Sequence, residues 1–273
     1  MASSFPSIPS LTWLSSHLVH PLLEGELGIL ALDFDQTLAQ ALPTLGDEHF
    51  YHFLKQLNRN RGMDADAHYR WTVKIREKIS YEPCEPIEKI NRLIQEFREK
   101  GWIVKVLTSR GEDMRQATAN HLRQANLDLS LEDVIFKTRS ENGTLKKKDE
   151  SLISWMRQDP KWFDGRKVHV LFADDSARYC EEVSRVGQTI LQASVICYQY
   201  TTSAPIPNLS KLQLAQLAVL LDAYQKGAEI SPEWDLARCE EAMDNLGLSE
   251  MTPEAFHEVM IRMAENDLTP FSS

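Results

Sequence analysis

The sequence has little of what several protein classes require. Its 273 residues include only 4 Cys, which are widely spaced and contain no Cys-x-x-Cys pair. This argues against a disulfide framework or a zinc site. No stretch approaches the roughly 20 apolar residues that a membrane-spanning helix needs. The 11 Gly form neither a dinucleotide fingerprint nor a P-loop, so those nucleotide-binding classes are not indicated.

Positive charge is also in the minority. The chain has 40 Asp+Glu against 30 Lys+Arg and a formal net charge of −10, which argues against binding to a nucleic-acid polymer. The first 28 residues contain no Lys or Arg, so they do not resemble a secretory signal peptide. These features predict a cytoplasmic protein with no signal peptide, no membrane span and no nucleic-acid partner.

Short apolar runs alternate with helical patterns along the middle of the chain. The runs are continuous, which is typical of strands buried on both faces of a parallel sheet. Between them, apolar residues repeat at steps of three and four, as in amphipathic helices. The alternation predicts an α/β fold with a Rossmann-like, doubly wound parallel sheet. The expected strands are 28–34, 102–108, 133–136, 168–173 and 189–200, and the expected helices include 87–97, 114–125 and 152–156.

Two segments fall outside this alternation. Residues 26–38 and 84–200 are expected to form the core domain, with 39–83 as an inserted helical module. The insertion is basic within an acidic protein, which indicates either solvated helix faces or a lid that attracts an anionic substrate. Residues 201–273 are predicted to be helical and packed on the core, with a partner-binding module as the alternative. The cations of the insertion are Arg59, Arg61, Arg70, Lys74, Arg76 and Lys78, beside Tyr69 and Trp71.

Polar residues follow the expected strands. Ligand sites in open parallel sheets form at the carboxyl ends of the strands, so several carboxylates, a hydroxyl and an ammonium group could converge there. In chain order these are Asp33 and Asp35, then Thr108, then one of the lysines 146–148 before a helix, and finally Asp174 and Asp175.

Such a cluster favours phosphoryl chemistry. A hard divalent cation that prefers oxygen ligands, such as Mg²⁺, offsets the repulsion between neighbouring carboxylates. The cation and a lysine would form a positive pocket for a phosphoryl group. One aspartate could act as a covalent nucleophile, and a second could act as general acid and base. The alternative is a carboxylate-rich strand edge without activity.

The same residues resemble the motifs of the haloacid dehalogenase (HAD) superfamily. Residues 32–38, Leu-Asp-Phe-Asp-Gln-Thr-Leu, resemble its Asp-x-Asp-x-Thr signature. Residues 106–110, Val-Leu-Thr-Ser-Arg, resemble its second motif, and 172–175, Phe-Ala-Asp-Asp, its fourth. The third motif is a lysine before a helix, for which Lys148 fits best and Lys147 is the alternative. The resemblance covers about residues 26–200 and implies the HAD fold with a small helical cap of the C1 type.

The resemblance also implies residue roles. Asp33 is the expected nucleophile, which forms an aspartyl-phosphate, and Asp35 is the expected general acid/base. Thr108 is expected to hydrogen-bond the phosphoryl oxygens, and Lys148 to neutralise them and hold the Asp33 carboxylate. The presence of Asp35 favours phosphate-ester hydrolysis over the dehalogenase and phosphonatase branches of the family.

The implied cofactor is Mg²⁺. Its expected binding groups are the Asp33 carboxylate, the Asp35 backbone carbonyl and Asp174, with Asp175 supporting them. Many relatives carry Asn or Asp a few residues after the fourth-motif acids, whereas residues 176–179 here are Ser-Ala-Arg-Tyr. This departure predicts weaker metal binding or another group that completes the site.

The functional expectation is a Mg²⁺-dependent phosphatase that hydrolyses a phosphate monoester. The alternatives are a phosphotransferase or mutase with the same intermediate, and a catalytically weak scaffold whose C-terminal helices bind a partner. The expected substrate is a phosphorylated small molecule or a phosphoprotein, including one with phosphotyrosine. Residues 45–50, Leu-Gly-Asp-Glu-His-Phe, also resemble a HAD subgroup found in intracellular bacteria, which implies delivery to a host cell by a specialised secretion system.

Overall fold

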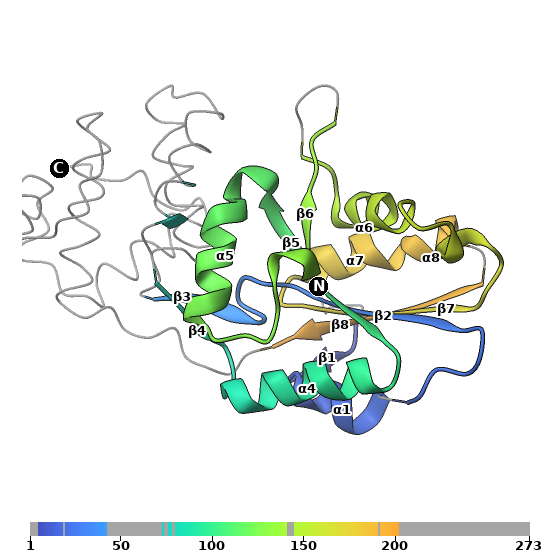
Figure 1. Cartoon of the computed structure of the whole chain (residues 1–273), viewed down its shortest axis with the longest axis horizontal. Helices are drawn as coiled ribbons and strands as arrows, with labels where there is room; N and C mark the ends of the chain where they lie inside the picture. The colour runs from blue at the N-terminus through green and yellow to red at the C-terminus, as the bar shows by residue number, and fades with distance from the viewer. Residues whose placement is uncertain are drawn as a thin grey trace, which may run out of the picture. The chain divides into compact units, whose positions relative to one another are not determined.

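The core of the molecule is a six-stranded sheet whose strands all run parallel (Figure 1). The computed structural model describes residues 5–18, 20–42, 73, 76–77, 80–140, 145–190 and 192–201. The strand order is β1-β8-β7-β2-β5-β6, which confirms the predicted Rossmann-like α/β fold with a doubly wound sheet. The strands are β1 (Ser7–Ile8), β2 (Leu27–Leu32), β5 (Ile103–Gly111), β6 (Val134–Lys137), β7 (Val168–Asp174) and β8 (Ala193–Tyr200).

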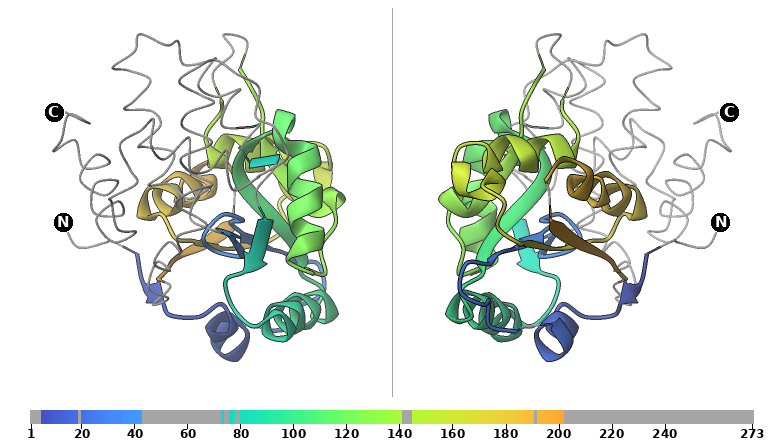
Figure 2. Two further views of the ribbon diagram at one scale, coloured as in Figure 1. Left: turned by 90° about the vertical axis from the view of Figure 1, so that its left-hand side faces the viewer. Right: turned by 90° about the vertical axis from the view of Figure 1, so that its right-hand side faces the viewer.

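Helices cover both faces of this sheet. Figure 1 shows α1 and α4 on one face and α6, α7 and α8 on the other, and Figure 2 shows α1 beside α4. Short 3₁₀ helices span Glu112–Met114, Leu131–Asp133 and Pro160–Phe163. The α-helices are α1 (Thr12–Leu18), α4 (Ile87–Glu99), α5 (Arg115–Gln124), α6 (Lys148–Met156), α7 (Ala177–Ser184) and α8 (Val186–Thr189).

Helix α4 illustrates why the middle of the chain was predictable. Its apolar residues at steps of three and four, from Ile90 to Phe97, are buried against the sheet. Pro86 precedes the helix, and Gly101 follows it with a φ of +85°, a conformation that glycine adopts without strain. Trp102 precedes β5, and its ring packs against Gly28. A Cβ atom added at Gly28 would lie only 2.7 Å from the Trp102 ring. A larger residue at position 28 would displace this ring.

The N-terminal residues contribute elements that the sequence pattern did not predict. Strand β1 extends the sheet by pairing with β8, Ser7 opposite Gln199 and Ile8 opposite Tyr200. The segment is attached to the core by Glu85, which accepts hydrogen bonds from Ser10 Oγ at 2.8 Å and Leu11 N at 2.5 Å. A two-residue strand is too short to produce a recognisable periodicity.

The two peripheral segments lie mostly outside the described residues. Strands β3 (Ala39–Leu42) and β4 (Ser80–Pro83) pair as a two-stranded sheet at the two ends of the insertion. Within the insertion, Val73, Arg76 and Glu77 are helical. The remaining residues of the predicted helical module, and the predicted C-terminal helices after residue 201, fall outside what the structure describes. Met1–Gln40 and Tyr81–Ser203 form one compact unit.

Among the described residues, no helix is long and apolar enough to cross a membrane. Cys84, Cys180 and Cys197 are free thiols, and the last two are buried.

Candidate functional site

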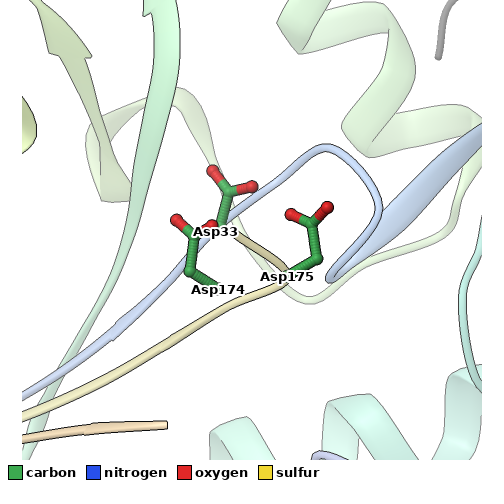
Figure 3. Close-up of side chains that lie close together, drawn as sticks. All are labelled: Asp33, Asp174 and Asp175. Atoms are coloured by element: carbon green, nitrogen blue, oxygen red, sulfur yellow. The ribbon is translucent and has the colours of Figure 1, made fainter. Parts of the chain in front are cut away.

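Three aspartates converge at the carboxyl ends of β2 and β7. Asp33, Asp174 and Asp175 each offer a carboxylate oxygen, and these oxygens all lie within 4.8 Å of one another (Figure 3). The two strands are neighbours in register, with Leu32 opposite Ala173, and the Asp33 N–H donates to the Ala173 carbonyl at 2.9 Å. Strand β2 also lies where the chain reverses its order across the sheet, which is where open α/β sheets bind ligands.

Lys148 joins two of these carboxylates. Its Nζ donates to Asp33 Oδ1 at 2.5 Å and to Asp174 Oδ2 at 2.6 Å, and its side chain is fully buried. Lys147, the other candidate from the sequence, is exposed at the beginning of α6, and its backbone N–H donates to Glu150. Of the two lysines, the structure therefore brings Lys148 into the cluster.

A buried glutamate positions Lys148. Glu182 of α7 is 2% exposed, and its Oε2 accepts the Lys148 backbone N–H at 3.0 Å. The carboxylate thus accepts a hydrogen bond from one of the free N–H groups in the first turn of α6. Its negative charge also interacts favourably with the positive end of the helix dipole. Nothing in the sequence pointed to Glu182, because an acidic residue on an amphipathic helix ordinarily faces solvent.

Two buried threonines organise the loops around the cluster. Thr37 Oγ1 accepts the Asp175 N–H at 3.1 Å and so ties the loop after β2 to the end of β7. Thr108 lies on β5, two residues beyond Val106, which pairs with Leu32. Its Oγ1 accepts the Arg110 N–H at 3.1 Å. Thr108 therefore lies in the part of β5 that is next to the carboxyl end of β2.

The Asp35 carboxylate pairs with Arg110. Arg110 Nε donates to Asp35 Oδ2 at 2.8 Å and Nη2 donates to Oδ1 at 2.7 Å, which makes a two-pronged ion pair. The Tyr81 hydroxyl donates to Oδ1 at 3.0 Å. The ion pair stabilises Asp35 in its carboxylate form. Metal binding by the Asp35 backbone carbonyl stays a prediction.

Arg110 is held from several sides. It is 2% exposed, and its Nη1 donates to Thr118 Oγ1 at 3.0 Å and contacts His121 Nδ1 at 2.9 Å. The guanidinium also lies 4.3 Å from the centroid of the Phe34 ring. Arg110 was identified from the sequence only as part of a motif, and its pairing with Asp35 was not predicted. An arginine within a buried strand was the available signal, since such a cation requires an anionic partner.

Burial and mutual repulsion oppose the ionisation of the clustered aspartates. Burial raises the pKa of Asp33 well above its ordinary value, and Asp174 and Asp175 add to this rise, while Lys148 opposes it. Burial likewise raises the pKa of Asp174. The two carboxylates that contact Lys148 raise its pKa above the ordinary value despite burial, so the lysine remains an ammonium.

The residues present suit a hard divalent cation. Three carboxylates offer oxygens within 4.8 Å of one another, and Lys148 pairs with two of them, Asp33 and Asp174. The donor atoms of the cluster are oxygens, which are the ligands that hard cations prefer. The triad could therefore hold a metal ion, with Asp33, Asp174 and Asp175 as the candidate ligands.

Divalent cations are expected to stabilise the protein, and more strongly at higher pH. Because the folded-state pKa of Asp33 is raised, its contribution to stability is fully present below the pKa of the unfolded chain and is lost as the pH rises through the folded-state pKa. A cation bound to the carboxylates offsets this loss, by about 2.7 kcal/mol at one hundred times its Kd. We expect the difference in Tm between samples with Mg²⁺ and with EDTA to be larger at about pH 8 than at about pH 5.

Two isosteric variants, one inside the cluster and one outside it, test whether the cation binds to the aspartates. Asp175→Asn removes one candidate ligand and is expected to reduce the cation-dependent rise in Tm. Asp128→Asn changes an exposed aspartate outside the cluster and is expected to retain the full rise. Identical Tm values with Mg²⁺ and EDTA at both pH values would contradict the metal assignment.

Loss of Arg110 is expected to destabilise the fold. Arg110→Met removes the two-pronged ion pair with Asp35 and should lower the free energy of unfolding by about 3–5 kcal/mol. Adding Asp35→Asn should recover part of that loss, because the carboxylate that pairs with Arg110 is then absent. Urea denaturation of the two single variants and the double variant measures the coupling. Arg166→Met, which removes a partly exposed arginine, should cost under about 0.5 kcal/mol.

Comparisons of the chain with protein-family models, with curated proteins and with solved structures found no match.

Proposed function

We propose that this protein is a Mg²⁺-dependent phosphatase that hydrolyses a phosphate monoester through an aspartyl-phosphate on Asp33. The observation that carries the proposal is the buried lysine between Asp33 and Asp174, with a third carboxylate beside them. This combination at the switch point of a doubly wound sheet suits a dianionic phosphoryl group. The resemblance of four ordered motifs to the HAD superfamily supports the same proposal.

Asp33 is the proposed nucleophile. A carboxylate oxygen of Asp33 forms a bond to phosphorus while the bond from phosphorus to the ester oxygen breaks. Lys148 already donates to Asp33 Oδ1, so it holds the carboxylate in place and offsets negative charge on the transferred group. Bound Mg²⁺ would supply further charge neutralisation and orientation of the phosphoryl oxygens.

Asp35 is the proposed general base for the second step, in which water hydrolyses the aspartyl-phosphate. The ion pair with Arg110 suits this role because it favours the carboxylate form. Protonation of the leaving oxygen in the first step requires Asp35 in its acid form, which the same ion pair disfavours. We therefore expect aryl phosphates, whose leaving groups need little protonation, to react faster than alkyl phosphates.

The proposal is tested with p-nitrophenyl phosphate and Mg²⁺. We expect release of p-nitrophenol together with an equal amount of inorganic phosphate, and loss of both when EDTA replaces Mg²⁺. A phosphotransferase would instead pass the phosphoryl group to an added alcohol such as glycerol, so that less free phosphate than phenol appears. No turnover of aryl phosphates, sugar phosphates, nucleotides or phosphotyrosine peptides by the wild-type protein would overturn the proposal.

A further inference from the structure

A second lysine lies at the carboxyl end of the sheet. Lys137 is the last residue of β6, pairs in register with Gly111 of β5, and is only 8% exposed. Its Nζ lies 4.7 Å from the centroid of the Tyr179 ring. Within the described part of the chain, this ammonium group makes neither a hydrogen bond nor an ion pair. The largely buried side chain disfavours a charged ammonium group here, so an anionic partner would stabilise it.

Lys137 shares its aromatic neighbour with the lysine of the aspartate cluster. Lys148 Nζ lies 4.5 Å from the centroid of the same Tyr179 ring. The two ammonium groups are therefore on the same edge of the sheet and close to one ring, which each contacts in cation–π geometry. Lys148 pairs with both Asp33 and Asp174, whereas no carboxylate of a described residue pairs with Lys137.

Glu182 is a source of negative charge for Lys137, but it also contacts two other groups. Glu182 favours the charged form of Lys137, but its oxygens accept the Lys148 backbone N–H and pair with Arg178 at 3.5 Å. Burial accordingly lowers the pKa of Lys137 from its ordinary value. An anion that bound next to Lys137 would supply the missing partner and stabilise the ammonium form.

The position of β6 separates Lys137 from the phosphoryl group itself. Strand β5 lies between β2 and β6, so the backbone of Lys137 is two strand spacings, or about 10 Å, from the strand that carries Asp33. Lys148 occupies the place beside Asp33. Lys137 is therefore free of the contacts that Lys148 makes with Asp33 and Asp174, and it lies near Lys148 through their shared contact with the Tyr179 ring.

We propose that Lys137 binds a second anionic group of the substrate, so that the preferred ester carries a carboxylate or another phosphate near its phosphoryl group. This inference rests on the proposed function for the identity of the first anionic group. It assigns Lys137 to substrate selection, and the hydrolytic step remains with Asp33 and Asp35.

Binding of two non-hydrolysable phosphonates tests the inference without requiring turnover. The probes are 2-carboxyethylphosphonate and propylphosphonate, which are of similar size and differ by one carboxylate. Calorimetry with Mg²⁺ present is expected to show that the wild-type protein binds the carboxylated probe about 10- to 100-fold more tightly, as for a hydrogen bond to a charged group. Lys137→Gln and Lys137→Met should abolish this preference and leave propylphosphonate binding unchanged.

The control and the contrary outcomes separate this inference from the proposed function. Lys167→Gln, at a half-exposed lysine paired with Glu26, should retain the preference. A preference that survives in both Lys137 variants, or an equal loss of affinity for both probes, would overturn the assignment. If the wild-type preference is present but no phosphate ester is turned over, the anion subsite stands and the proposed phosphatase activity fails.

Discussion

Replacing Asp33 with Asn is expected to reduce Mg²⁺-dependent turnover of p-nitrophenyl phosphate by at least about a thousandfold, because the amide cannot form the aspartyl-phosphate. Initial rates with saturating Mg²⁺ measure the loss. The change is nearly isosteric, and Lys148 keeps its contact with Asp174, so the site should retain its shape. A variant that retains most of the wild-type rate would overturn the role of Asp33 as nucleophile.

Stability measurements show whether lost turnover reflects chemistry or unfolding. Asp33→Asn removes one of three clustered carboxylates, so in EDTA at neutral pH the variant should be at least as stable as the wild-type protein. Asp128→Asn provides the matched control, since it makes the same chemical change at an exposed position and should leave both turnover and Tm unchanged. A large fall in the Tm of Asp33→Asn would show that Asp33 mainly supports the fold.

Replacing Lys148 with Met is expected to affect both activity and stability. Loss of this donor should cost roughly 3 kcal/mol of transition-state stabilisation, about a hundredfold or more in rate. The buried carboxylates of Asp33 and Asp174 would also lose their cation, which should lower the free energy of unfolding by about 3–5 kcal/mol at neutral pH. Steady-state kinetics and urea denaturation measure the two effects.

The adjacent lysine supplies the control for this prediction. Lys147→Met makes the same substitution one residue earlier, at an exposed side chain, and should leave the rate unchanged and stability within about 0.5 kcal/mol. Because burial opposes ionisation of Asp33, the destabilisation of Lys148→Met should diminish as the pH falls and the carboxylates take up protons. Equal effects of the two substitutions would contradict the assignment of Lys148.

Long, regular segments were predictable because their chemistry is local. A fully buried strand such as β2 requires a continuous apolar run, and an amphipathic helix such as α4 requires apolar residues every three or four positions. These patterns located five of the strands that form the sheet and the helices α4, α5 and α6, but not α7 or α8, which lie between β7 and β8. They did not indicate β1, whose two residues owe their place to pairing with β8.

The candidate site was predictable at the level of which residues approach one another. Parallel strands end at a common edge, so Asp33 and Asp174 could be expected together once the strands were assigned. The choice between Lys147 and Lys148 could not be made in the same way. Adjacent residues in the first turn of a helix point about 100° apart, so the packing of α6 against α7 decides which one is buried.

The pairing of Arg110 with Asp35 depends on tertiary structure alone. The two residues are 75 positions apart. Each belongs to a different sequence motif, and neither motif indicates that the two side chains pair. The packing of Arg110 against Phe34 and Tyr81, together with its contacts to Thr118 and His121, aligns the guanidinium with the Asp35 carboxylate. The burial of Lys137 beside Tyr179 likewise cannot be predicted from the sequence of β6 alone.

The sequence by itself determined the fold class of this protein and the sheet edge at which its carboxylates gather, because hydrophobic periodicity and strand direction are local properties. Tertiary structure alone decided which charged groups pair and which lysines are buried. Those outcomes depend on distances and desolvation set by segments that are far apart in the chain.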